Sequence, residues 1–191
     1  TMDLATPDGV ARGHVEINAP RTGETSGDVR IEAGGPLTIR GAASIAVNAF
    51  QTYQPPGADG TVKQDNGDAG GSPVGADGVI GLDQIDARNT QFIAAAWNNG
   101  GLTGANGRLA GLMAYGTAFH LRPGVELRAT GDLTVEGDLD LSGFRYGPHA
   151  DPAPRGSGEP GVLWLRAGGD LNIHGNINDG FGLPPGSPDS A

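Results

Sequence analysis

Four acidic residues close to one another in the last third of the chain could serve acid–base catalysis, and they are Asp132, Glu136, Asp138 and Asp140. Glycosidases hold two carboxyl groups about 5 to 10 Å apart. Residues i and i+2 on one strand face lie about 6.5 Å apart, so Asp138 and Asp140 would meet that requirement. Every strand with alternating acids meets it as well, and no hydrolase motif accompanies this pair. We therefore expect a solvated acidic face and no enzymatic activity.

A second group of acids lies in the glycine-rich segment 54–78, QPPGADGTVKQDNGDAGGSPVGADG. Asp65, Asp68 and Asp77 offer the oxygen ligands that calcium prefers, which makes them candidates for a calcium site. Their spacing does not fit an EF-hand, and the glycine-rich calcium-binding nonapeptide repeat is missing. We expect a flexible exposed loop here, and no cofactor for the chain.

Composition excludes several classes of protein. The chain has 191 residues with 35 glycines and 14 prolines, which does not suit an ordinary helical domain. A net charge of −10, with only 12 Lys and Arg, argues against nucleic acid as a partner. The absence of cysteine excludes disulfides and zinc–thiolate sites. No run approaches the ~20 apolar residues of a transmembrane helix, so no membrane span is expected.

The acids near the C-terminus alternate with apolar residues, which is typical of strands with one buried face. The expected inward side chains are Val125, Leu127, Ala129, Leu133, Val135, Leu139 and Leu141. The run LRATGDLTVEG (127–137) resembles two others, GDVRIEAGGPLTIRG (27–41) and GVLWLRAGGDLNIHG (161–175). We expect each run to form strands that meet at glycine corners, such as Gly34–Gly35 and Gly168–Gly169.

Short strands with a narrow aliphatic stripe and 5% aromatic residues predict an all-β fold, a right-handed parallel β-helix or β-solenoid. A β-sandwich is the alternative. Residues 54–120 interrupt the pattern and predict an insertion, a Gly/Asp-rich loop followed by a helical segment. Its amphipathic helix is marked by apolar residues three, four and seven apart, namely Leu82, Ile85, Phe92, Ile93, Ala96 and Trp97.

Two places in the predicted solenoid offer candidate contact residues. Phe144, Arg145, Tyr146 and His149 lie in a proline-rich loop, where binding residues often occur. Trp164 takes an outward position on its strand, where the insertion or another chain would cover it. We expect these five residues to contact a ligand or receptor, or to anchor the loop.

The runs HLRPGVELRATGDLTVEGDLDLSGFRYGP (120–148) and GSGEPGVLWLRAGGDLNIHGNINDGF (156–181) resemble secreted exoproteins of the filamentous haemagglutinin type. Segments 42–53 and 108–124 resemble the same family. The resemblance implies a β-helical segment, residues 1–191, of a larger bacterial exoprotein that is secreted or displayed on the cell surface. It also implies export of the parent chain by an outer-membrane two-partner secretion transporter.

The function expected from this resemblance is structural and adhesive. The segment would present loops to a host-cell receptor, a glycan or the matrix, in adhesion, biofilm formation or virulence. Two other functions stay open at this point. One is a β-helical carbohydrate-active enzyme, a polysaccharide lyase or hydrolase, and the other is a self-assembling extracellular filament subunit that associates through open solenoid ends.

Overall fold

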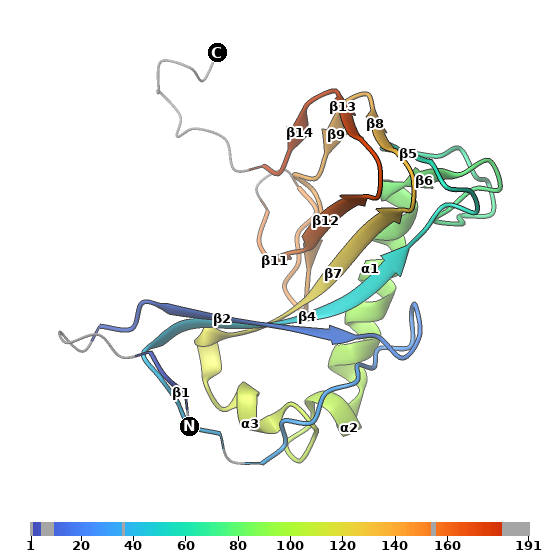
Figure 1. Ribbon diagram of the computed structural model, residues 1–191. Coiled ribbons are helices and arrows are strands. Elements are labelled where there is room, and N and C mark those ends of the chain that lie inside the picture. Colours follow the sequence, from blue (N-terminus) through green and yellow to red (C-terminus); the bar gives the residue numbers. More distant parts are fainter. Residues whose placement is uncertain (1, 5–9, 36, 154–155, 181–191) are drawn as a thin grey trace.

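Parallel strand pairing organises the chain in the computed structural model, which describes residues 2–4, 10–35, 37–153 and 156–180 (Figure 1). The first four-stranded sheet has the order β12-β7-β4-β2 and the second has the order β13-β8-β5-β6. Their strands are β2 (Gly13–Pro20), β4 (Ala42–Tyr53), β5 (Gly60–Lys63), β6 (Val79–Gly81), β7 (Phe119–Ala129), β8 (Leu133–Glu136), β12 (Val162–Ala167) and β13 (Leu171–His174).

The remaining elements are short, apart from one long helix. Two-stranded parallel sheets join β1 (Met2–Asp3) to β3 (Ile39–Arg40) and β9 (Leu139–Asp140) to β14 (Ile177–Asn178). An antiparallel pair joins β10 (Arg145–Tyr146) to β11 (Glu159–Pro160). The helices are α1 (Leu82–Asn98), α2 (Gly100–Thr103), α3 (Ala110–Met113) and the 3-10 helix η1 (Gly116–Ala118).

Two of the three similar sequence runs lie side by side. Leu127 pairs with Leu165, Leu133 with Leu171 and Leu139 with Ile177, and hydrogen bonds between these levels join residues 38 apart. We call residues 119–141 the third level and residues 162–178 the fourth level of stacked strands. The predicted alternation is confirmed in the third level, because its inward residues Val125, Leu127, Ala129, Leu133, Val135 and Leu139 are buried.

The third run, residues 27–41, folds differently from the other two. Residues 29–33 form no strand beyond an isolated bridge between Arg21 and Val29, so the strand predicted there is wrong. Instead, the N–H of Ala33 donates to the Arg108 carbonyl, and its own carbonyl accepts from the N–H of Gly111. This segment lies beside the start of α3 because those backbone groups offer it partners.

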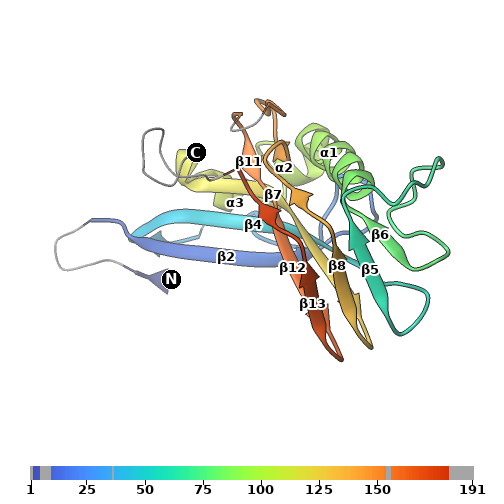
Figure 2. The same cartoon turned by 90° about the horizontal axis from the view of Figure 1, so that it is seen from above.

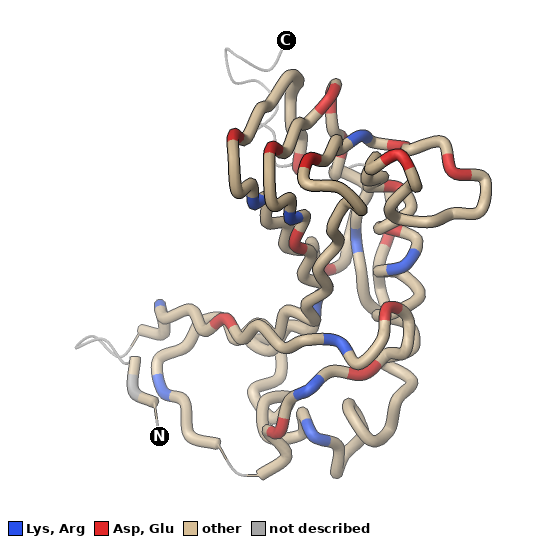
Figure 3. The backbone as a smooth tube through the Cα atoms, turned by 45° about the vertical axis from the view of Figure 1, so that its right-hand side comes forward, with Lys and Arg blue, Asp and Glu red and all other residues tan. Residues whose placement is uncertain are grey.

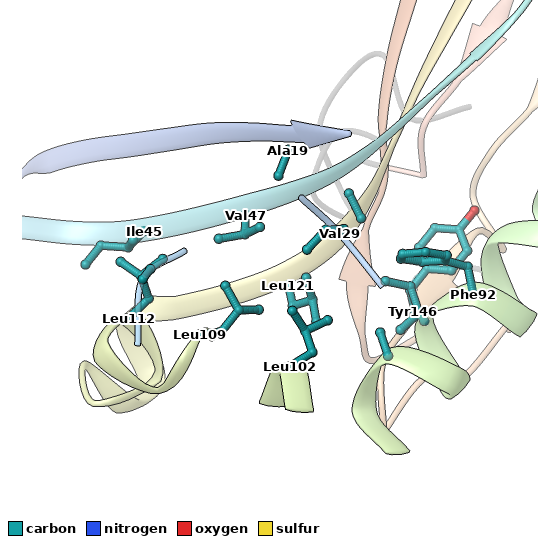
Figure 4. Packing of buried hydrophobic residues seen from close by; sticks show 14 residues of the cluster. Ala19, Val29, Ile45, Val47, Phe92, Leu102, Leu109, Leu112, Leu121 and Tyr146 are labelled. Carbon is teal, nitrogen blue, oxygen red and sulfur yellow. The ribbon is translucent and has the colours of Figure 1, made fainter. Parts of the chain in front are cut away.

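Helices cover one face of the first sheet (Figure 2). Ile45, Val47 and Leu121 from β4 and β7 pack against apolar side chains of the helical segment, which include Phe92, Leu102, Leu109 and Leu112 (Figure 4). A second cluster fills the space between the two four-stranded sheets and includes Val62, Ile80, Leu127, Leu133 and Val135. The helices therefore provide about half of the core that the strands need.

The predicted all-β, right-handed parallel β-helix is contradicted by this architecture. Over the described residues the fold is a mixture of helices and strands, and the strands are divided among five small sheets of two to four strands. The physical reason lies in residues 82–113, whose apolar side chains cover β2, β4 and β7 in place of a facing sheet.

The segment predicted as an insertion contributes to both layers. The amphipathic helix is confirmed as α1, with Leu82, Ile85, Phe92, Ile93 and Ala96 buried along one side. The stretch expected as a loop contains β5, which pairs with β8 and buries Val62 completely. A single apolar residue between polar neighbours gave too weak a periodic signal to predict this strand.

Gly168 tests the close stacking of the third and fourth levels. A Cβ atom added there would overlap the carbonyl group of Thr130 on the neighbouring level, whereas a Cβ at Gly35 would meet no atom within 4 Å. Because the overlapping atoms belong to the backbone, we expect Gly168→Ala to lower the free energy of unfolding by about 1–3 kcal/mol. Gly35→Ala is the matched control, and chemical denaturation measures both. Equal stability of the two variants would contradict the described stacking.

Candidate functional site

The acidic row of the third level is engaged in bonds to the fourth level. Asp138 Oδ1 accepts from the backbone N–H of Asn176 at 2.7 Å and from its side-chain amide at 3.1 Å. Asp140 Oδ1 accepts from the N–H of Ser142 at 3.0 Å and from the Asn178 side chain at 3.2 Å. Each carboxylate thus fixes the strand beside it or its own turn, which is a structural task.

The electrostatics of this row do not suit a general acid. The hydrogen bonds from Ser142 hold the pKa of Asp140 below its ordinary value, and the carboxyl group is exposed. A general acid of a glycosidase has a raised pKa instead. Glu136 lies 3.2 Å from the ammonium group of Lys63, in an exposed ion pair. The row holds the levels together and brings no acid–base pair into a cleft.

A ladder of aspartates follows the turn between the two sheets, where acidic positions lie on neighbouring levels (Figure 3). Asp59 Oδ1 accepts from the N–H of Asp132 at 2.8 Å, and Asp132 Oδ1 accepts from the N–H of Asp170 at the same distance. In the opposite direction, Gly60 N–H donates to the Asp132 carbonyl and Leu133 N–H donates to the Asp170 carbonyl. Each level therefore binds the next one through one carboxylate and one backbone N–H.

Three of the five predicted contact residues form the inner wall of a loop. Arg145 is 8% exposed and Tyr146 is 3% exposed, while Phe144 packs between both core clusters. Arg145 donates to the carbonyls of Phe144 and Asp179. These three side chains anchor the loop, which is one of the two roles that we expected for them.

The other two residues lie apart from this wall and from each other. His149 is exposed. Trp164 is half-buried and packs edge-on against Phe50 of β4, with ring centroids 4.9 Å apart, so a strand and not the insertion covers it. Gly124 makes room for this pair, since a Cβ there would lie 3.2 Å from Phe50 and 3.3 Å from Trp164.

The candidate calcium ligands lie in separate turns. Asp65 Oδ1 accepts from Gly67 N–H at 2.8 Å, Asp68 Oδ1 from Gly70 N–H at 2.6 Å and Asp77 Oδ1 from Val79 N–H at 3.1 Å. The bonds from the Gln84 side chain and from Gly67 lower the pKa of Asp65. No group of three or more His, Asp or Glu side chains is placed to hold a metal ion within the ranges that the structure describes.

A buried polar cluster joins α1 to the strands, and the sequence patterns gave no sign of it. Arg21 Nη2 donates to Asn89 Oδ1 at 2.6 Å, Arg21 Nε donates to the Ala49 carbonyl, and the guanidinium lies 4.2 Å from the centre of the Phe92 ring. Burial lowers the pKa of Arg21 to about 10. The Tyr146 hydroxyl donates to Asp86 Oδ1 at 2.7 Å. These groups hold α1 against the sheet.

An apolar cavity of about 240 Å³ lies next to this cluster. Leu82 and Ile85 of α1, Val125 of β7 and Val162 and Leu163 of the fourth level line it. Its polar lining includes Asn89 and Tyr146, whose side chains already bond to Arg21 and Asp86. The cavity therefore offers an apolar surface without polar groups free to orient a substrate.

Asp86 makes the stability of the cluster depend on pH. Burial raises its pKa, with a smaller contribution from the charge of Asp83. The folded chain then holds a proton that the unfolded chain releases, so this site contributes less stability as pH rises above the carboxyl's ordinary value. Asp86→Asn keeps an acceptor for Tyr146 but removes the charge. We expect this variant to be at least as stable as the parent chain at pH 7 and to lose that advantage near pH 4.

Asp86→Ala is the matched comparison, since it leaves the buried Tyr146 hydroxyl without its acceptor. We expect a loss of about 1–3 kcal/mol in the free energy of unfolding. Urea denaturation between pH 4 and 7 measures all three proteins. A difference between the parent chain and Asp86→Asn that is independent of pH would contradict the raised pKa.

None of the helices in the described ranges combines the length and apolar character that a transmembrane helix needs. Comparison with known proteins adds no relative to this description. No protein-family model, no curated protein and no solved structure matches the chain.

Proposed function

We propose that the chain is a non-enzymatic structural and adhesive segment of a bacterial secreted or cell-surface exoprotein of the filamentous haemagglutinin type. One observation carries the proposal: the two runs that bear the family resemblance, 120–148 and 156–181, supply the strands of the third and fourth levels. Those strands pair in parallel with every inward residue in step. Sequence repetition thus corresponds to repetition in space, which suits a scaffold.

The chemistry of the polar side chains supports a structural role. The carboxylates of Asp132, Asp138 and Asp140 spend their lone pairs on backbone and amide groups of the fourth level and of one adjoining turn. A catalytic pair would instead face a cleft with one carboxyl group protonated. The described cavity is lined by none of these three acids.

Two loops project from the stacked strands and are the parts that we assign to adhesion. The first surrounds Asp65 and extends beyond β5 and β6 (Figure 2). The second follows β10, where residues 148–151 are exposed and include His149. Loops held by a rigid scaffold commonly carry binding residues. A host-cell receptor or a glycan is the proposed ligand, and the parent chain would be exported by its outer-membrane partner.

Adhesion is tested with beads coated with the purified chain and applied to epithelial cells and to immobilised matrix. We expect coated beads to be retained more than albumin-coated beads, and His149→Ala or Asp65→Asn to reduce retention severalfold. Asp65→Asn preserves the turn bond to Gly67, so its effect reports the charge. Asp138→Asn, in the acidic row and outside both loops, is the control and should leave retention unchanged. Retention equal to that of albumin would contradict the adhesive role.

The absence of enzymatic activity has its own test. We expect no turnover when the chain is incubated with acidic and neutral polysaccharides and the products are followed by reducing-end and unsaturated-product assays. Turnover that is lost in Asp138→Asn or Asp140→Asn would show that the acidic row is catalytic and would overturn the proposal.

A further inference from the structure

The fourth level exposes an apolar row that the third level buries. Leu171, Ile173 and Ile177 are 44%, 50% and 43% exposed. Their partners in the third level, Leu133, Val135 and Leu139, are at most 1% exposed. β12 and β13 are edge strands of the two four-stranded sheets, and β14 is paired on one side only (Figure 2). Long apolar edges of this kind readily accept another strand.

The backbone at this edge repeats a binding pattern used twice inside the molecule. At the earlier levels, a carboxylate accepts the N–H of the residue beside it, and the following N–H donates to that residue's carbonyl. Asp59 with Gly60 binds Asp132 in this way, and Asp132 with Leu133 binds Asp170. Asp170 with Leu171 presents the same pair of groups at the edge. Within the described residues, no hydrogen bond engages the Asp170 carboxylate.

The charge of the edge also favours a particular partner. Arg166 is 67% exposed along its side chain and lies beside Arg128, and Glu126 compensates this pair from the third level at 2.8 Å. A carboxylate at an outward position of an added strand would compensate Arg166 from its other side. The edge therefore suits an extended segment with apolar residues at alternate positions and acids between them.

We propose that the edge formed by β12, β13 and β14 binds, in trans, an extended segment of another polypeptide chain that carries this same repeat. The segment adds parallel to the fourth level, as the fourth level adds to the third. Its apolar residues cover Leu171, Ile173 and Ile177, and its backbone bonds to Asp170 and Leu171. This inference rests on the proposed function and names a class of partner for it, a neighbouring exoprotein chain.

The test uses the full chain and a fluorescently labelled synthetic peptide of residues 124–141, GVELRATGDLTVEGDLDL. In the register of the existing levels, its Asp132 lies beside Asp170 and its Glu126 lies on the strand next to Arg166. We expect saturable binding by fluorescence anisotropy and none for a scrambled peptide. Ile173→Lys, which places a charge in the apolar row, should weaken binding by about tenfold or more, since buried strand contacts supply the affinity.

Matched variants separate the contacts from general effects. Asp170→Ala should weaken binding severalfold, whereas Asp170→Asn keeps an acceptor and should bind like the parent chain. His149→Lys adds the same charge as Ile173→Lys outside the edge and should have no effect. Ile173 is exposed, so circular dichroism should show both lysine variants folded.

Three results would overturn the inference. They are the absence of binding up to about 1 mM peptide, where the binding free energy is only about 4 kcal/mol, equal binding of the scrambled peptide, and self-association of the chain that Ile173→Lys abolishes while the peptide has no effect. The last result would assign the edge to a second copy. Failed bead adhesion with intact peptide binding would refute the adhesive role alone.

Discussion

In-register parallel pairing between strands 38 residues apart is the constraint on which the C-terminal half of the molecule depends. A shift by one residue would turn Leu127, Leu133 and Leu139 outward and bring their charged neighbours into the core. The aspartate ladder at the turn and the close approach of Gly168 to Thr130 both require the same register. Apolar burial, backbone pairing and the polar turn therefore favour one arrangement together.

The helical segment solves a different problem, the open face of the first sheet. β2, β4 and β7 have apolar side chains that no facing sheet covers, and α1, α2 and the residues around Leu109 supply the missing layer. The buried Arg21–Asn89 bond and the Tyr146–Asp86 bond then fix the position of α1. Stacked strands stiffened on one face by helices form a rigid support from which the two loops project, as adhesion requires.

Local patterns in the sequence predicted those parts of the fold that depend on local periodicity. The alternation around Leu133 and the helical spacing around Ile85 predicted a strand and a helix that the structure contains. The run 27–41 has nearly the same pattern as 161–175, yet it pairs with the loop before α3. The all-β prediction failed for a related reason, because periodicity identifies an apolar face without telling which element covers it.

The candidate site was less predictable than the fold. The bonds of Arg21 to Asn89 and of Tyr146 to Asp86 join residues 68 and 60 positions apart, and no spacing rule relates them. An Arg–Tyr pair in a proline-rich loop is typical of an exposed contact, whereas here the antiparallel pairing of β10 with β11 places both side chains at the edge of the core. The acidic row was expected on the solvated face, and the exposed positions of Glu136, Asp138 and Asp140 agree with that expectation.

Amide hydrogen exchange on the isolated chain at low concentration tests the central claim, stacked strand levels that end in an unpaired edge. The account predicts slow exchange throughout β7 and β8, where strands lie on both sides. It predicts slow and fast amides alternating along β12 and β13, because only the N–H groups that point to the third level are bonded. Uniformly slow exchange in β12 and β13, equal to that in β7 and β8, would contradict it.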